Sequence, residues 1–469
     1  MKLGAFALDY DGTIATDGGM HADVRAAIGG ARDRGIAVIL ATGRRLDHLK
    51  HGAGDLGCFD AIVAENGAVL DFPARGRHVL LGRPPPPAFV DELRRRGLTF
   101  DVGECLVEAD AGASGTIIEV IHALQQPLVL TFNRGRVMVL PQAVGKSTGL
   151  REALTTLRLS IHNAIGIGDA ENDHDLLDAC EVGAAVEWGS PALLAVADDV
   201  IQGRGPEAVA GYIREMTHRG ELSAAQMGRR RILLGHQHSG EAVSLAVRGR
   251  PVVIAGEPGT GKSWLAGLMC EQLILQGYSL CVIDPEGDYA SLEALPDVVV
   301  LGGNDPPPRA RELSRALRHP DVSVVIDLSK MRHRDKLQYV DSAMELLLRL
   351  RRQTGLPHGI VVDEAHYLLA GKTFRALPPS DLCGGSPTCS GMAPWQHACR
   401  DSRPASRRKG SRSLPAQSVK RSGRAMSASR RASPRWRDAA GAPAGPNQQC
   451  DAVTSWGRRS CSSVFRRAP

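Results

Sequence analysis

The chain has 469 residues, which is enough for two or three domains that each bury a core. No apolar stretch reaches the roughly 18 residues of a membrane-spanning helix, and no signal segment opens the chain, so we expect a cytoplasmic protein without a membrane partner. The formal net charge of +6 hides a split, because residues 371–469 carry 19 Lys and Arg against 4 Asp and the rest of the chain is acidic.

The first part of the chain alternates short apolar runs with helical patterns. Strands that end in polar turns are predicted at Ala5–Leu8, Ile36–Leu40, Ala61–Val63 and Ala164–Ile167. Such alternation is typical of a parallel sheet covered by helices. Residues 1–67 and 146–215 are therefore predicted to form one Rossmann-like α/β core.

Residues 68–145 follow a different pattern, which predicts a small α+β insert between the two parts of this core. Its expected elements are a strand at His78–Leu81, a helix at Ala88–Arg96, a strand around Thr99–Val107, a helix at Ser114–Leu124, and a hairpin of Leu128–Phe132 with Val137–Leu140. The hairpin turns at Asn133-Arg134-Gly135, where the glycine suits a tight turn.

Two carboxylates, Asp9 and Asp11, stand at the end of the first predicted strand. In open α/β sheets ligands bind at the carboxyl ends of the strands. Two carboxylates there can share one Mg²⁺, one of them can attack phosphorus, and the other can act as general acid and then base. Paired surface acids are common, so the pair alone is a weak signal.

Three further groups follow in order along the chain. Thr42-Gly43-Arg44 comes after the second strand and offers a hydroxyl and backbone amides for phosphoryl oxygens. Lys146 precedes a helix and offers a fixed positive charge. Asp169 and Asp173, in the run Gly168–Asp173, follow another strand and offer carboxylates for a metal. Together with the opening acids, this order predicts a phosphoryl-transfer site.

The ordered set resembles the haloacid dehalogenase superfamily, in particular the Cof-type, C2-capped phosphatases, over roughly residues 1–215. Glu65-Asn66-Gly67-Ala68, before the insert, also fits that group. The resemblance implies that Asp9 is the nucleophile and a metal ligand. It implies that Asp11 is the acid/base and that its carbonyl also binds the metal.

The same resemblance implies roles for the later motifs. Thr42 would bind the phosphoryl group, with Gly43 and Arg44 as substrate contacts, and Lys146 would stabilise a phosphoaspartate. Magnesium would be held by Asp169, supported by Asp173 and Asn172. The insert 68–145 would be a C2-type cap that closes over the substrate. Its small size favours a small phosphomonoester.

A second α/β pattern follows a predicted linker at 216–228. Its elements are a hairpin of Ile232–Gly235 with Ala242–Leu245, strands at Val252–Ala255, Ser279–Ile283, Val298–Leu301, Val322–Ile326 and Gly359–Val362, and helices at Trp264–Leu275 and Arg334–Arg352. We assign residues 229–370 to this second domain.

The run from Gly256 to Ser263 matches the phosphate-binding pattern G-x-x-x-x-G-K-[ST] in full. The predicted ATP-binding residues are Gly256, Gly259, Gly261, Lys262 and Ser263. Backbone amides of such a loop surround phosphates, the lysine meets the β and γ oxygens, and the serine binds Mg²⁺. Gly145-Lys146-Ser147-Thr148 is not a second such loop, because Leu140 stands where the first glycine belongs.

Two acids support the nucleotide site. Asp363 follows an apolar strand and would hold Mg²⁺ through water, and Glu364 would orient the attacking water. The motif order resembles the HerA-FtsK class of P-loop ATPases, which are hexameric and typically pump DNA or protein. Asp284 and Glu286 fit either a nucleotide-site lining or a turn with solvated acids. The class has further strands after the second acid pair, so the domain is incomplete here.

From about residue 371 the apolar periodicity vanishes, and Arg, Ser, Pro, Ala and Gly dominate. Taken literally, residues 371–469 are a low-complexity, disordered basic arm that could bind nucleic acid through phosphate contacts. Because the change is abrupt and follows an unfinished ATPase core, we favour a shifted reading frame or a truncation.

The leading hypothesis is an enzyme in which a Mg²⁺-dependent phosphatase is fused to an ATP-binding domain. The alternative is a DNA-associated ATPase or translocase whose phosphatase half serves as a sensor or processes ends. A third is a truncated product in which only the N-terminal half works. The expected partners are a small phosphorylated metabolite, ATP, DNA through the ATPase domain or the tail, and further copies of the chain.

Overall fold

The structure is a computed structural model that describes residues 1–368 except 17, 53, 223–229 and 248–250. The predictions for 371–469, and for residues 223–228 of the linker predicted at 216–228, lie outside these residues. Helix α8 runs as far as Arg219, so the linker begins later than predicted. No helix in the described part of the chain is long and apolar enough to cross a bilayer.

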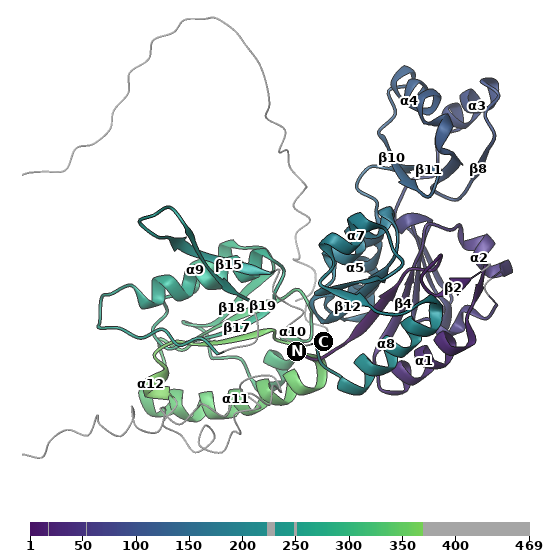
Figure 1. Ribbon diagram of the computed structural model, residues 1–469. Coiled ribbons are helices and arrows are strands. Elements are labelled where there is room, and N and C mark those ends of the chain that lie inside the picture. The colour runs from purple at the N-terminus through teal and green to yellow at the C-terminus, as the bar shows by residue number, and fades with distance from the viewer. Residues whose placement is uncertain (17, 53, 223–229, 248–250, 369–469) are drawn as a thin grey trace, which may run out of the picture. The chain divides into compact units, whose positions relative to one another are not determined.

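An eight-stranded sheet forms the N-terminal core (Figure 1). Its order is β14 (Asp199–Ile201), β13 (Val182–Val186), β12 (Ala164–Gly168), β1 (Ala5–Leu8), β4 (Ala37–Ala41), β5 (Ala61–Ala64), β6 (Val69–Phe72) and β7 (Arg77–Leu80). The strands from β14 to β5 are parallel, and β6 and β7 continue the sheet antiparallel. The α/β fold class predicted from the sequence is confirmed.

Helices cover both faces of this sheet because the buried strands carry apolar residues on both sides. On one face α1 (Ala22–Asp33) and α8 (Gly205–Arg219) lie side by side and pack with Phe6 and Leu8 of β1. On the other face, residues of α5 (Lys146–Leu157) and α6 (His174–Ala179) pack with the small side chains of β1. The core also contains β2 (Ala15–Thr16), β3 (Gly19–Met20), α2 (Leu46–Gly52) and α7 (Pro191–Val196).

The insert begins later than predicted. Residues 69–80 were assigned to it, but β6 and β7 pair with β5 and extend the core sheet. Alternating polar and apolar residues do not reveal which sheet a short strand joins, and this placement is set by tertiary pairing.

After β7 the insert, which we call the cap, is a separate antiparallel sheet with two helices. The sheet has the order β10 (Leu128–Asn133), β11 (Arg136–Pro141), β9 (Val107–Asp110) and β8 (Phe100–Val102). Residues of α3 (Pro87–Arg95) and α4 (Ser114–Ala123) pack with β9 and β11 in one apolar cluster. The single strand predicted around Thr99–Val107 is wrong, because a turn at Gly103–Leu106 divides it into β8 and β9.

The C-terminal described part is a second α/β unit. Its strands β18 (Val298–Gly302), β19 (Ser323–Asp327), β17 (Leu280–Asp284) and β20 (Gly359–Val362) are all parallel and lie in that order. Its helices are α9 (Lys262–Leu275), α10 (Ala310–Leu317), α11 (His333–Thr354) and α12 (Ala365–Leu368), and a hairpin of β15 (Arg231–His236) with β16 (Ala242–Ala246) precedes them.

The strand predicted at Val252–Ala255 is wrong in this structure. Residues 251–257 have no strand, and the side chains of Val252 and Val253 are 50% and 58% exposed. β-branched residues favour a strand only when a neighbouring backbone supplies hydrogen bonds and packing. The described strand β20 ends the sheet without pairing with this segment.

Candidate functional sites: an acidic phosphatase site and a phosphate-binding loop

Three neighbouring strands of the core sheet deliver the predicted phosphatase residues to one edge. β1 pairs with β4 and β12, with Leu8 opposite Leu40 on one side and Ile167 on the other. Asp9, Thr42 and Asp169 each follow the last residue of one of these strands. Parallel strands end at the same edge, so these residues begin their loops beside one another.

Lys146 is the first residue of α5, and its side chain is fully buried. Its Nζ lies 2.5 Å from Oδ1 of Asp9 and 2.6 Å from Oδ1 of Asp173. Burial lowers the pKa of Lys146, but the charges of Asp173 and Asp9 outweigh it and hold the pKa above its usual value. The residue is therefore a fixed ammonium ion between two carboxylates.

The nucleophile candidate, Asp9, is buried beside this ammonium. The pKa of Asp9 is raised to about 7, mainly by burial and also by the charge of Asp173, although Lys146 acts in the opposite direction. A divalent cation would add positive charge where the protein supplies too little, and it would favour the ionised carboxylate.

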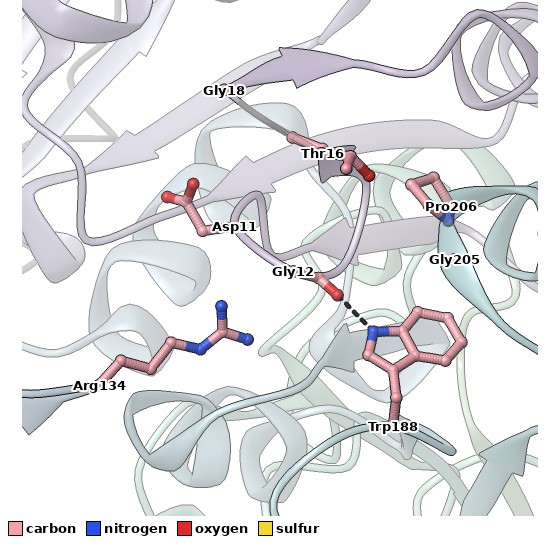
Figure 2. A pocket seen from close by; sticks show the side chains of 9 residues that line it. Asp11, Gly12, Thr16, Gly18, Arg134, Trp188, Gly205 and Pro206 are labelled. Carbon is pink, nitrogen blue, oxygen red and sulfur yellow. Dashed lines mark hydrogen bonds between the residues drawn. The ribbon is translucent and has the colours of Figure 1, made fainter.

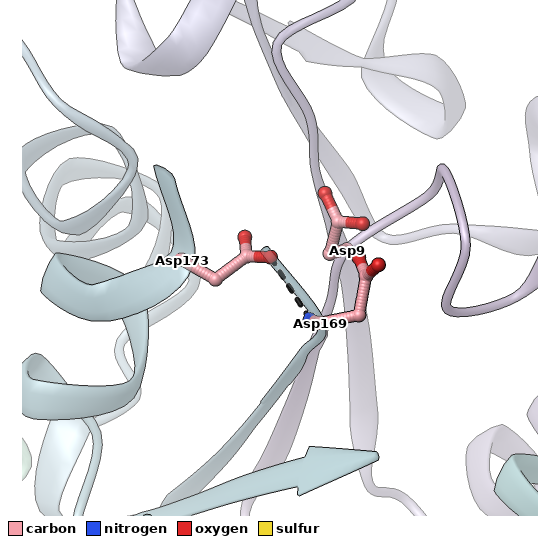
Figure 3. Close-up of side chains that lie close together, drawn as sticks. All are labelled: Asp9, Asp169 and Asp173. Atoms are coloured by element: carbon pink, nitrogen blue, oxygen red, sulfur yellow. Dashed lines mark hydrogen bonds between the residues drawn. The ribbon is translucent and has the colours of Figure 1, made fainter. Parts of the chain in front are cut away.

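Asp9, Asp169 and Asp173 together form a buried acidic cluster (Figure 3). One oxygen of each lies within 4.8 Å of the others. Carboxylate oxygens are the ligands that Mg²⁺ prefers, and the three carboxylates outnumber their two cationic neighbours, Lys146 and Arg134. Oδ2 of Asp169 is buried, and the group that contacts it is the guanidinium of Arg134, which is itself a cation. The residues present therefore fit a divalent metal.

Both oxygens of Asp173 accept hydrogen bonds. Its Oδ2 accepts the backbone N–H groups of Asp169 and Ala170, each at 3.0 Å, and its Oδ1 accepts from Lys146. Thr13 Oγ1 also donates to Asp169 Oδ1 at 3.2 Å. These bonds orient the loop that carries Asp169.

Asp11 lies outside the acidic cluster, and its side chain lines a neighbouring pocket (Figure 2). Arg44 binds both oxygens of this carboxylate, with Nε 2.7 Å from Oδ2 and Nη2 2.6 Å from Oδ1. The same guanidinium lies 5.0 Å from the ring centre of Tyr10. The predicted substrate contact Arg44 is thus bound to the predicted acid/base.

Hydrogen bonds and a close packing contact hold the loop after β4. Thr42 is buried, its Oγ1 accepts the N–H of Arg44 at 3.1 Å, and its carbonyl accepts the N–H of Asn66 at 2.9 Å. Gly43 lies under the cap, because a Cβ at this position would be 3.2 Å from Sδ of Met138. Asn172 donates to Asn66 at 3.4 Å and connects this loop with the one that carries Asp169.

A pocket of about 300 Å³ adjoins the acidic cluster, and its lining includes two residues that belong to none of the sequence motifs (Figure 2). Trp188 donates from Nε1 to the carbonyl of Gly12 at 2.8 Å, which fixes the loop after Asp11. Arg134 reaches from the β10–β11 turn of the cap, and its guanidinium contacts the carboxylate of Asp169. The predicted turn at Arg134 was the only sequence signal for either, because nothing local shows what a hairpin tip contacts.

Glu65 joins the core to the cap. Its buried carboxylate accepts the backbone N–H groups of Glu104 at 2.9 Å and Cys105 at 2.7 Å, both in the turn between β8 and β9. Burial raises the pKa of this carboxyl, and the two N–H groups lower it. Glu65 is therefore a structural part of the site that the sequence identified only as a family motif.

The phosphate-binding loop of the second unit is largely exposed. Gly259 and Gly261 have φ angles of 80° and 88°, a backbone region in which glycine is favoured, and α9 begins at Lys262 directly after them. Lys262 donates to the carbonyl of Glu257 at 3.3 Å, within its own loop. Ser263 is half-buried in the first turn of α9, and Gly256 is exposed.

The acid pair after β20 is more buried than this loop. Asp363 has a buried Oδ2 without a hydrogen-bond partner, and its Oδ1 accepts the N–H of Glu364 at 2.9 Å. Glu364 has a φ of 45° and lies 3.1 Å from His366. The described residues show no bond between this pair and the phosphate-binding loop.

Of the two interpretations left open for Asp284 and Glu286, the structure supports the turn. The carboxylate of Asp284 is buried and accepts N–H groups of the following four residues, from Glu286 at 3.2 Å to Tyr289 at 2.9 Å. All of its capacity is used inside the turn, so a role in lining a nucleotide site is not supported for Asp284.

Comparison with known proteins identifies the N-terminal half. Residues 6–93 and 98–213 match the family model for haloacid dehalogenase-like hydrolases. A phosphoglycolate phosphatase of Methanothermobacter thermautotrophicus is 30% identical over 220 residues, which cover 45% of this chain and 97% of that protein. The chain belongs to the haloacid dehalogenase-like hydrolases. It is an enzyme of the phosphatase type, as the sequence predicted.

Further proteins are similar to this half of the chain. A phosphoglycolate phosphatase of Halorubrum lacusprofundi is 27% identical over 237 residues, covering 46% of this chain and 98% of that protein. A solved phosphatase of the same superfamily from Bacteroides thetaiotaomicron has 20% identity and a TM-score of 0.39, covering 47% of this chain and 96% of that one. Residues 244–353 match the central domain of helicase HerA, so the HerA-like resemblance of the second half is also confirmed.

Proposed function

We propose that the N-terminal half is a Mg²⁺-dependent phosphatase that hydrolyses a small phosphomonoester through a phosphoaspartate at Asp9. The observation that supports this most directly is the buried ammonium of Lys146, 2.5 Å from Asp9 Oδ1. A lysine buried between two carboxylates costs desolvation energy, and such groups concentrate at sites where charge is handled.

In the proposed reaction an Oδ atom of Asp9 attacks phosphorus, and the bond from phosphorus to the leaving-group oxygen breaks. Asp11 gives its proton to that oxygen. A water molecule then attacks the phosphoaspartate while Asp11 takes a proton from it, so that inorganic phosphate leaves and the Asp9 carboxylate is restored.

The phosphoryl oxygens need donors on the side away from the nucleophile. Thr42 and the backbone of Gly43 would bind them, and Lys146 would offset the charge of the phosphoaspartate. Arg44 orients the carboxylate of Asp11 through two bonds, at 2.6 and 2.7 Å.

Magnesium would be held by Asp9, Asp169 and the backbone carbonyl of Asp11, with Asp173 orienting the Asp169 loop. It would supply positive charge that screens the attacking carboxylate from the phosphoryl oxygens. Asp173 is placed here as a supporting group because it accepts the backbone N–H groups of the Asp169 loop and the ammonium of Lys146.

Phosphoglycolate is the first substrate to test. Several relatives at 25–30% identity are named as phosphoglycolate phosphatases, and their matches cover most of their own lengths. The pocket of about 300 Å³ beside Asp11 also suits a small leaving group.

For the second half we propose ATP binding at Gly256–Ser263, with Mg²⁺ held by Ser263 and Asp363 and a water oriented by Glu364. The HerA match over 244–353 supports this proposal. The same match supports the alternative hypothesis of a DNA-associated ATPase with the phosphatase half as a sensor or end-processing unit. Retention on DNA that depends on salt and persists without residues 371–469 would favour that alternative.

The metal dependence is tested on the full chain with p-nitrophenyl phosphate, acetyl phosphate, sugar phosphates and 2-phosphoglycolate. Activity should be lost in EDTA and return with Mg²⁺, and acid quenching during turnover should trap a phosphoryl group on the peptide that contains Asp9. Mg²⁺ should also raise the melting temperature, because binding to the folded acidic cluster stabilises it. Full activity in EDTA would contradict the proposal.

A further inference from the structure

Arg134 occupies an unusual backbone position at the tip of the cap hairpin. Asn133 pairs with Arg136, so Arg134 and Gly135 form a two-residue turn, with φ angles of 45° and 79°. Positive φ is common for glycine but uncommon for arginine, and such positions cluster at functional sites. The turn directs the Arg134 side chain at the core (Figure 2).

The core leaves space for this guanidinium. Gly12 has a φ of 81°, and a Cβ on it would overlap the guanidinium of Arg134. The side chain of Arg134 is 51% exposed and lines the pocket next to Asp11. Among the described residues that line this pocket, Arg134 is the basic one.

The other positive charges near the pocket are already matched by acids. Lys146 bonds to two carboxylates, and Arg44 is held by both oxygens of Asp11. Arg134 pairs with Asp169, the carboxylate that the proposed Mg²⁺ would use. A carboxylate bound to a divalent cation has less attraction left for a guanidinium, so Arg134 would need another anion.

We propose that Arg134 binds a carboxylate on the leaving group of the substrate and so makes the phosphatase select small, carboxylate-bearing phosphomonoesters. This inference rests on the phosphatase function proposed above. The phosphoryl group has its own donors at Thr42, Gly43 and Lys146, which leaves Arg134 for the remainder of the substrate. A planar guanidinium matches a carboxylate through two parallel N–H bonds, and in this structure its partner is already a carboxylate.

The test compares 2-phosphoglycolate with 2-hydroxyethyl phosphate, in which a hydroxymethyl group replaces the carboxylate. We measure kcat and KM with Mg²⁺ for the full chain and for Arg134→Ala, Arg134→Lys and the control Arg136→Ala. Arg136 lies in the same hairpin, but it binds Glu108 at 2.9 Å and Asp101 at 3.4 Å within the cap.

The wild-type chain should prefer the carboxylate substrate in kcat/KM by about tenfold to a hundredfold, the range of a bond to a charged group. Arg134→Ala should bring this ratio close to one, mainly by raising KM for 2-phosphoglycolate. Arg134→Lys should keep part of the ratio, because lysine keeps the positive charge but lacks the planar pair of N–H groups. Arg136→Ala should keep the whole ratio.

A binding measurement gives a second readout that needs no turnover. Titration calorimetry should show that phosphonoacetate binds more tightly than ethylphosphonate, and that Arg134→Ala removes the difference. An unchanged ratio in Arg134→Ala, or an equal fall for both substrates, would overturn the inference. Hydrolysis of 2-hydroxyethyl phosphate without a carboxylate preference would overturn the inference alone, whereas no hydrolysis of any phosphomonoester would overturn the proposed function.

Discussion

The lysines of the two phosphate-binding motifs lie in opposite environments. Lys146 is fully buried and bonds to Asp9 and Asp173. These two acids lie in the loops that follow β1 and β12, which are neighbouring strands of one sheet. Lys262 lies in a largely exposed loop and donates to the carbonyl of Glu257. The residues of the first motif set are brought together at one edge of a sheet. The second motif set matches its sequence pattern, but no paired strand leads into its loop.

The difference shows what positions a phosphate site in an α/β protein. Asp9 follows β1, which is paired on both sides by β4 and β12. The segment before the second loop, residues 251–257, pairs with no described strand. A loop is fixed in space by the strand that leads into it, so the geometry of the second site depends on backbone pairing that the described residues lack.

Substitution of the proposed nucleophile, Asp9, should have the largest effect and should separate the phosphatase activity from nucleotide binding. Asp9→Asn should reduce phosphatase turnover by at least about 10³-fold, because an amide does not replace a carboxylate nucleophile. Binding of a fluorescent ATP analogue by the same variant should be unchanged. Asp33→Asn, an exposed carboxylate at the end of α1, is the matched control for both assays. If Asp9→Asn also abolished nucleotide binding, the two sites would not be independent.

The same lysine-to-alanine change should have different consequences in the two motifs. Lys146→Ala leaves two buried carboxylates without a counter-ion, so the free energy of unfolding should fall by about 3–5 kcal/mol, and phosphatase activity should be lost. Lys262→Ala should change the free energy of unfolding by less than about 0.5 kcal/mol while removing nucleotide binding. Urea denaturation and both activity assays on each variant check this. Equal destabilisation by the two changes would contradict the contrast in burial.

A glycine behind the phosphatase lysine offers a steric test. Gly67 has a φ of 103°, and a Cβ on it would overlap the carbonyl oxygen of Gly145, next to Lys146. Gly67→Ala should destabilise the fold by about 1–3 kcal/mol and lower kcat roughly 10- to 100-fold, since a displacement of about 1 Å at a catalytic group has effects of that size.

Two other glycines serve as references for this change. Gly261→Ala in the second loop meets no atom within 4 Å, so its effect should be limited to local backbone strain. Gly29→Ala, at an open position in α1, should stabilise the protein slightly. A kcat for Gly67→Ala equal to that of Gly29→Ala would show that Lys146 does not depend on this close approach.

The smallest expected effect concerns the buried thiols. Their reaction rates compare how tightly the cap and the second unit are packed, and no substitution is needed. Burial raises the pKa of Cys105 in the cap to about 11, and it raises the pKa of Cys270 and Cys281 in the second unit to about 12. At pH 8 only about a thousandth of the first thiol and a ten-thousandth of the others would be thiolate, so iodoacetamide should react slowly with all three.

Mass spectrometry of the separate peptides gives the rate for each cysteine, with urea-unfolded protein as the reference for free reaction. Raising the pH should accelerate all three reactions, because the thiolate is the reactive form. Faster labelling of Cys270 and Cys281 than of Cys105 would show that the second unit opens more readily than its packing indicates.

Sequence reasoning succeeded where the information is local. The strands before Asp9 and Asp169, the helix that begins near Lys146 and the α/β class all follow from apolar runs that end in polar turns. It missed β6 and β7 as core strands, because their pairing with β5 is a tertiary fact. It also predicted a strand at Val252–Ala255 from β-branched residues alone, without a pairing partner.

The candidate site shows the same division. Asp9, Lys146 and Asp173 were singled out from their order in the chain, and the structure brings them within bonding distance. The contacts of Trp188 with Gly12 and of Arg134 with Asp169 join segments far apart in the sequence. No local pattern marks such contacts, so a single sequence does not predict them.

The bonds of Glu65 restrict how the cap can open. Its buried carboxylate receives two backbone N–H groups from the turn between β8 and β9. Lifting the cap straight off the core would break both of these bonds. A swing about the Glu65 contact would keep both bonds while it moves the hairpin tip that carries Arg134 away from Asp169. The substrate would then enter beside the hairpin tip that carries Arg134, while the Glu65 contact stays in place.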